Sequence, residues 1–106
     1  MNQEELLKHH EELCNYALEL MKRKNHDYAG KNGNTPFANF ERSEAMGLCS
    51  TEAAMMVRMT DKMSRLSTFI DCGELKVKNE GYKDAVIDLI NYLVIFSGYI
   101  DSKKPK

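Results

Sequence analysis

The sequence predicts an all-α fold, a small helical bundle of three long helices plus one short helix that assembles into an oligomer. Three stretches carry apolar residues at steps of three and four with charged residues between them, which is the period of an amphipathic helix. Ser50, Gly47 and Gly73 are suited to helix ends and stand beside these stretches. At 106 residues and 12.2 kDa the chain fits one domain, 1–106, with residues 1–2 and 102–106 expected to be flexible ends.

The first half of the chain predicts one long and one short helix. The long helix spans residues 3–27, and a glycine- and asparagine-rich loop follows it. Thr35 and Pro36 then suit the N-cap and the first turn of a short helix with the sequence FANFERSEAM, which Gly47 ends.

The second half predicts two further long helices. Ser50 caps a helix over 51–71, whose apolar stripe consists of Met55, Met59, Met63, Leu66 and Ile70. The last helix spans about 80–100 and is apolar on two sides. Its predicted inward face consists of Val86, Leu89, Ile90 and Leu93 with Ser97 or Ile100, and its second apolar side of Ile87, Val94 and Ile95. Because such a helix must be buried on both sides, we expect a homo-oligomer, a dimer or larger.

Composition excludes several classes of function. A formal net charge of −1 gives no general attraction to duplex nucleic acid or to an anionic membrane. The three cysteines are far apart and favour neither a disulfide framework nor a zinc site. His9 and His10 are adjacent, point about 100° apart, and are interpreted as structural or surface residues. The sequence shows no signal peptide and no membrane span, so we expect a cytoplasmic protein without a membrane partner.

Two polar stripes on apolar helices are the main indication of a site. The last helix carries Asp84, Asp88 and Asn91 at helical spacing, and the preceding helix carries Arg58, Asp61, Lys62 and Arg65. If the two helices form an antiparallel hairpin, facing residue numbers add to about 151, which brings the stripes together. One interpretation is an ion-pair network that only fixes the helix register. The number of charges favours a ligand-binding cluster instead.

A second group of candidate residues surrounds the loop after the first helix. Cations and aromatic rings there are suited to hold a base and its phosphates. The alternative is that Phe37 and Phe40 only pin the loop to the core. The candidates are Lys24, Asp27, Tyr28, Phe37, Asn39 and Phe40.

Four motifs in order, KNHDYAG, PFANFERSEAMG, RMTDKMSRL and DAVIDLINYLVI, resemble the phage and prophage proteins called nucleotide modification associated domain proteins. That family is remotely similar to all-α nucleotide pyrophosphatases of the MazG and dimeric dUTPase kind. The resemblance implies an oligomeric helical protein in which ExxE and ExxD carboxylates hold magnesium. Asp88 matches the ExxD aspartate, with Ala85 where the glutamate should stand and Asp84 before it. The ExxE pair falls near Lys62 and Arg65, with Asp61 beside them.

Three cations among these carboxylates make a poor magnesium cage but a good phosphate site. We therefore expect a phage-type protein that binds a phosphorylated nucleotide or nucleotide-derived, for example cyclic, ligand without a cofactor. Its role would be sequestration in counter-defence or phage nucleotide metabolism, in an infected or lysogenic bacterial cell. One alternative is a magnesium-dependent nucleoside triphosphate pyrophosphohydrolase with Asp61, Asp84 and Asp88 as metal ligands. Another is a protein-interaction module with a structural charge cluster. No residue is assigned a catalytic role.

Overall fold

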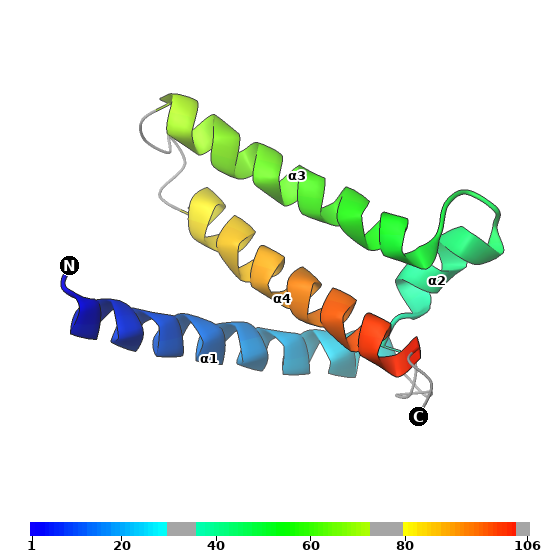
Figure 1. The fold of residues 1–106 in the computed structure, drawn as a ribbon, viewed down its shortest axis with the longest axis horizontal. Helices are drawn as coiled ribbons and strands as arrows, with labels where there is room; N and C mark the ends of the chain where they lie inside the picture. The colour runs from blue at the N-terminus through cyan, green and yellow to red at the C-terminus, as the bar shows by residue number, and fades with distance from the viewer. Residues whose placement is uncertain (30–35, 73–79, 104–106) are drawn as a thin grey trace.

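The computed structural model describes residues 1–29, 36–72 and 80–103, without the side chains of 25–29 and 80. This part of the chain forms the helices α1 (Gln3–Ala29), α2 (Ala38–Ala45), α3 (Thr51–Cys72) and α4 (Glu80–Lys103), shown in Figure 1. No strand occurs among these residues, so the described part of the chain is all-α, as predicted.

The ends of the long helices lie within three residues of the predicted positions. Asn2 begins α1 as a capping box, because its Oδ1 accepts from Glu5 N at 2.8 Å and Glu5 Oε1 accepts from Asn2 N at 3.4 Å. At the other end of the chain, α4 continues to Lys103. Ser102 Oγ donates to Tyr99 O at 2.7 Å there, so the helix extends into the segment 102–106 that was expected to be a flexible end.

The start of α2 differs from the prediction. Thr35 lies outside the described residues, but Pro36 falls in a turn before the helix and Phe37 is the N-cap, without a side-chain capping bond. The Phe37 ring meets Tyr99 edge to face at a centroid distance of 5.3 Å. A tertiary contact, and not local capping, therefore accompanies the start of α2. The predicted end is confirmed, because Gly47 follows the helix with a φ of 78°.

Two side chains cap α3. Ser50 Oγ accepts from Ala53 N at 3.0 Å, which confirms the predicted N-cap. Glu44, from the end of α2, adds a second cap, since its Oε1 accepts from Thr51 N at 2.7 Å and from Thr51 Oγ1 at 3.0 Å. These hydrogen bonds lower the pKa of the Glu44 carboxyl below its ordinary value.

Helix α3 packs along α4, α2 packs on α3 near the C-terminal end of α4, and α1 crosses α4 (Figure 1). Lys62 pairs with Asp88, and Phe69 stacks on Tyr82 with ring centroids 4.9 Å apart. Both contacts lie within one residue of the register predicted for the α3 and α4 hairpin. The two predicted polar stripes are therefore level with each other.

The core is small and lies mostly at the α2 end of the molecule. Phe40, Met55, Met59 and Tyr99 form its buried cluster. Ala17 of α1 and Ala85 and Ile87 of α4 are the other buried hydrophobic residues of the described chain.

Several residues predicted to face the core are exposed instead. Met63 is 56% exposed, Ile70 is 76% exposed and Leu93 is 55% exposed, and Ser97 is also exposed. The inward face predicted for α4 was therefore wrong in part, since the residues it buries best are Ala85, Ile87 and Tyr99. The reason is that α1 and α3 each pack on α4, and the described part of this short chain supplies nothing more to cover Leu93 and Val94.

The apolar character of α4 has a further consequence. By length and composition alone, its segment Gly81–Lys103 is apolar enough to cross a membrane, with 17% of its most apolar window buried. No segment of this kind was expected from the sequence. The core helices of soluble proteins pass the same test, so this observation by itself places the chain in no compartment.

Candidate functional site

Asp88 of α4 lies between lysines from two other helices. Its Oδ2 is 3.0 Å from Lys62 Nζ of α3, and its Oδ1 is 3.6 Å from Lys24 Nζ of α1. The side chains of Asp88 and Lys62 are 19% and 16% exposed, whereas that of Lys24 is 48% exposed. The three groups carry one net positive charge, and the two lysines connect all three long helices through a single carboxylate.

The position of each group follows from its helix. Lys62 lies one turn beyond the buried Met59, so its methylene stem packs beside the α3 and α4 contact. Asp88 is one residue from the buried Ile87 and one turn beyond the buried Ala85. A carboxylate at this depth needs partners, because desolvation of an unpaired charge is costly. The two lysines supply those partners.

Arg58 and Arg65 extend the positive charge along α3. They lie four residues before and three residues after Lys62, which places all three on one side of the helix over about 10 Å. Both arginines and Asp61 are exposed, and among the described residues these three form no ion pair. The two predicted stripes therefore meet at Lys62 and Asp88.

The other two members of the acidic stripe have separate positions. Asn91 donates from Nδ2 to Ala17 O at 3.1 Å and so attaches α1 to α4. Asp84 is exposed and lines a cavity on the α1 side of α4. Three residues at helical spacing thus have three different surroundings.

Two of the three aromatic candidates belong to the core or pack against it. Phe40 is 8% exposed and meets Tyr92 edge to face at 6.2 Å between ring centroids, and Phe37 packs on Tyr99. These contacts match the alternative in which the two rings pin the segment to the core. Asn39 is exposed on α2. Asp27 and Tyr28 belong to the last turn of α1, but their side chains lie outside the described residues.

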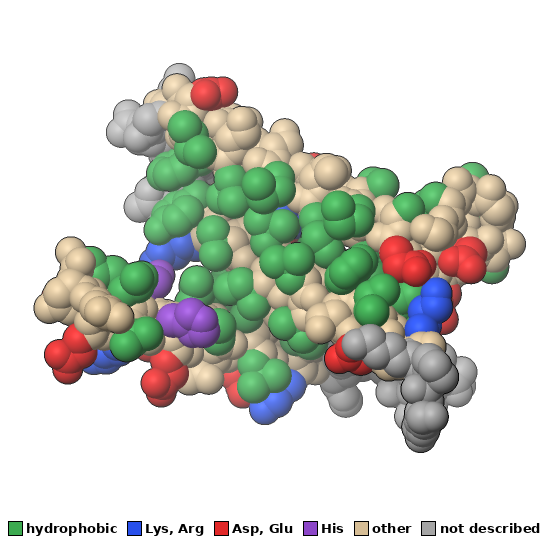
Figure 2. Space-filling view, in the orientation of Figure 1, with side chains coloured by type: hydrophobic (Ala, Val, Ile, Leu, Met, Phe, Trp, Pro, Cys, Tyr) green, Lys and Arg blue, Asp and Glu red, His purple; other side chains and the backbone are tan. Residues whose placement is uncertain are grey.

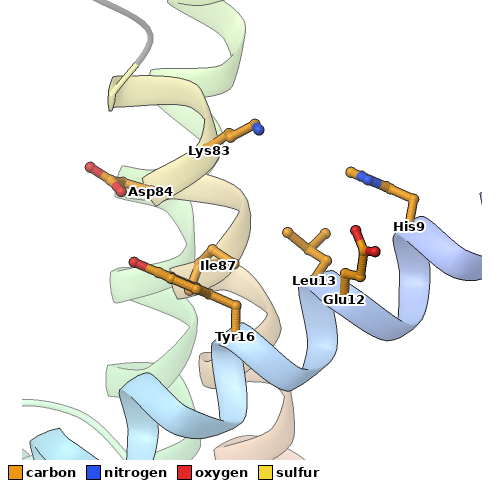
Figure 3. A pocket seen from close by; sticks show the side chains of 7 residues that line it. All are labelled: His9, Glu12, Leu13, Tyr16, Lys83, Asp84 and Ile87. Atoms are coloured by element: carbon orange, nitrogen blue, oxygen red, sulfur yellow. The ribbon is translucent and has the colours of Figure 1, made fainter.

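A cavity of about 430 Å³ lies between α1 and α4 and was not expected from the sequence. In Figure 3, Lys83 extends toward the side of His9, the Tyr16 ring lies across Ile87, and Asp84 points away from His9. No sequence signal identified this cavity, because it results from the angle at which α1 crosses α4. Its lining residues are His9, Glu12, Leu13, Tyr16, Lys83, Asp84 and Ile87.

The acidic residues do not fit a magnesium site. Among the described residues, no three Asp, Glu, His or Cys side chains lie close enough together to hold a metal ion. Asp61 and Asp84 are exposed on different helices, and both oxygens of Asp88 face lysines. A metal ion here would have to compete with two ammonium groups for one carboxylate.

The fold and the site thus define an all-α protein with a carboxylate held between two lysines. A scan against protein-family models and searches of curated proteins and of solved structures found no match to this chain.

Proposed function

We propose that the chain binds the phosphate groups of a phosphorylated nucleotide or nucleotide-derived ligand on the charged side of the α3 and α4 pair. The observation that carries the proposal is the bridge from Lys24 and Lys62 to the two oxygens of Asp88. The bridge holds two ammonium groups from different helices beside one carboxylate, and the three groups together keep one net positive charge. An anion that approaches this cluster meets that positive charge and a Lys62 side chain that Asp88 already holds in place.

The surrounding charges support a phosphate in preference to a single carboxylate. Arg58 and Arg65 stand on either side of Lys62, are exposed, and make no ion pair with the described residues. Guanidinium groups bind phosphate oxygens in pairs, and lysines add point charges. In this arrangement Lys24, with a side chain 48% exposed, turns from Asp88 to the ligand, and Asp88 keeps Lys62 in place.

Two of the three aromatic rings expected to hold the base are already engaged in the fold. Phe37 and Phe40 pack edge to face on tyrosines of α4, which favours a role in the core over a contact with the base. Tyr28, one turn beyond Lys24 on α1, is the remaining aromatic candidate of the original group. The sequence resemblance supports a phage protein that sequesters a nucleotide signal or serves phage nucleotide metabolism.

The proposal also includes the helical bundle and the homo-oligomer that are expected from the sequence. The pyrophosphohydrolase alternative is weaker, because Asp61, Asp84 and Asp88 do not converge on one point. The interaction-module alternative would leave Arg58 and Arg65 without a small-molecule ligand. These three possibilities predict different responses to nucleotides.

A thermal-shift panel of mono-, tri- and cyclic nucleotides, each with and without magnesium, tests the proposal. Ligand at about 100 times its Kd adds about 2.7 kcal/mol to the free energy of unfolding, which raises Tm by several degrees. We expect that shift without magnesium and without release of phosphate or pyrophosphate. Lys24→Ala should weaken it, while Lys22→Ala, which removes an exposed lysine of the same helix, should not.

Two outcomes would contradict the proposal. Release of pyrophosphate that depends on magnesium would favour the hydrolase. No shift with any nucleotide would favour the interaction module.

A further inference from the structure

The α3 and α4 pair has a charged side and an apolar side. Met63 and Arg65 are two residues apart on α3, so their side chains point about 200° apart around the helix. Arg65 belongs to the charged side with Lys62. Met63 is therefore on the other flank, together with Met56 and Ile70, which lie seven residues before and after it.

Helix α4 continues the apolar side. Ile90 is two residues from Asp88 and also points about 200° away from it. Leu93, 55% exposed, and the partly exposed Val86 follow the same stripe as Ile90. Figure 2 shows hydrophobic side chains that cover the middle of one face of the molecule, with most of the charged groups near its rim.

The exposed area is larger than that of a compact protein of this size. The accessible surface is 8406 Å², whereas a folded monomer of 12.2 kDa exposes roughly 6,100 Å². The radius of gyration is 16.0 Å, compared with about 13 Å for a compact chain of this length. The excess is roughly 2,300 Å² for each copy. If both copies buried this excess in one interface, the total buried area would lie within the range of obligate homodimers.

The beginning of α1 also lacks cover. Every residue from 1 to 12 is exposed, and Leu6 and Leu7 are 54% and 62% exposed. Leu6 and Leu7 lie in the first turns of the 27-residue α1, so burial in a second molecule would remove their apolar surface from water. A second molecule would supply the missing contact.

We propose that a second copy of this chain covers the apolar side formed by Met56, Met63, Ile70, Ile90 and Leu93, in a two-fold symmetric dimer. The same side of the second copy is apolar in the same places, as an interface around a two-fold axis requires. The charged side, with Lys24, Lys62 and Asp88, stays on the outside of the dimer. This inference assigns an interface to the homo-oligomer of the proposed function and does not depend on the nucleotide.

The apolar side suits a protein partner better than a lipid bilayer. Helix α4 is long enough to cross a membrane, but it packs on α1 and α3 and carries the Asp88 bridge to two lysines. A bilayer around α4 would displace those helices and leave the carboxylate unpaired in hydrocarbon. The apolar side is also continuous with the protomer's own core, because Met59 lies one turn from both Met56 and Met63.

Light scattering coupled to size-exclusion chromatography tests the proposal on the full chain. The expected mass is twice 12.2 kDa. Met63→Glu should weaken the dimer at least about 100-fold, because the two-fold axis places the new charge in the interface twice. Ser64→Glu is the matched control, since it adds the same charge at the next exposed position, pointing away from α4.

Ile70→Glu is a second disrupting variant, and circular dichroism establishes that each variant remains helical. A wild-type mass of 12.2 kDa at tens of micromolar, or equal masses for Met63→Glu and Ser64→Glu, would overturn the proposal. Recovery of the wild-type chain only in the membrane fraction would overturn it too. Loss of nucleotide binding with an intact dimer would affect only the proposed function.

Discussion

Asn91 donates its side-chain amide to the backbone carbonyl of Ala17 at 3.1 Å, across 74 residues of sequence. This hydrogen bond lies where α1 crosses α4, next to the buried Ala17 and Ile87. A backbone carbonyl inside α1 already accepts one helical hydrogen bond, and Asn91 uses its second lone pair. The amide therefore positions α1, and with it Lys24, relative to Asp88.

The first prediction concerns this bond. Asn91→Leu should lower the free energy of unfolding by about 1–2 kcal/mol, because the partly buried hydrogen bond is lost and Leu does not replace it. Urea denaturation provides the measurement. Asn15→Leu, at an exposed position of α1, is the control and should change stability little. Equal effects of the two substitutions would mean that the bond contributes nothing.

The second prediction compares two ion pairs of similar length. Lys62 and Asp88 are 3.0 Å apart with side chains less than a fifth exposed, while Lys22 and Glu19 are 3.2 Å apart with side chains about two-thirds exposed. Double-mutant cycles should give a coupling energy of about 1 kcal/mol or more for the first pair and about 0.3 kcal/mol for the second. Raised salt should reduce mainly the second. Equal coupling energies would show that burial does not strengthen the Asp88 bridge.

The third prediction separates ligand binding from folding. Arg65 is exposed and makes no ion pair with the described residues, so Arg65→Ala should change stability by less than about 0.5 kcal/mol. If the arginine holds phosphate, the same substitution should weaken nucleotide binding about tenfold or more in isothermal titration calorimetry. Arg42→Ala removes the same charge from an exposed position of α2 and should leave the affinity for nucleotide unchanged. Unfolding of Arg65→Ala would instead indicate a structural role.

The fourth prediction concerns pH. The hydrogen bonds from Thr51 lower the pKa of Glu44 in the folded chain, so the ionised carboxylate stabilises the fold. This contribution is complete above the unfolded pKa and is lost as the pH falls through the lower folded pKa. Glu44→Gln should therefore reduce stability near neutral pH and flatten its decrease in acid, as measured by urea unfolding between about pH 3 and pH 7. Glu41→Gln, at an exposed site of α2, is the control. Parallel pH profiles for wild type and Glu44→Gln would contradict the prediction.

The sequence determined the local structure of this protein. The 3.6-residue period and the capping residues Ser50 and Gly47 act within a few residues, so they predicted the long helices and most of their ends. The hairpin register was also predictable, because two antiparallel helices rise equally per residue. That register carried Lys62 to the level of Asp88.

The tertiary structure decided which apolar and polar residues found partners. A helical period cannot tell which of two apolar sides a single chain covers, and the protomer left Met63 and Leu93 exposed. The angle of α1 across α4 gave Asp88 its second lysine, used Asn91 for packing, and opened the cavity beside Asp84. Such angles depend on the packing of side chains far apart in the sequence, and no local pattern records them.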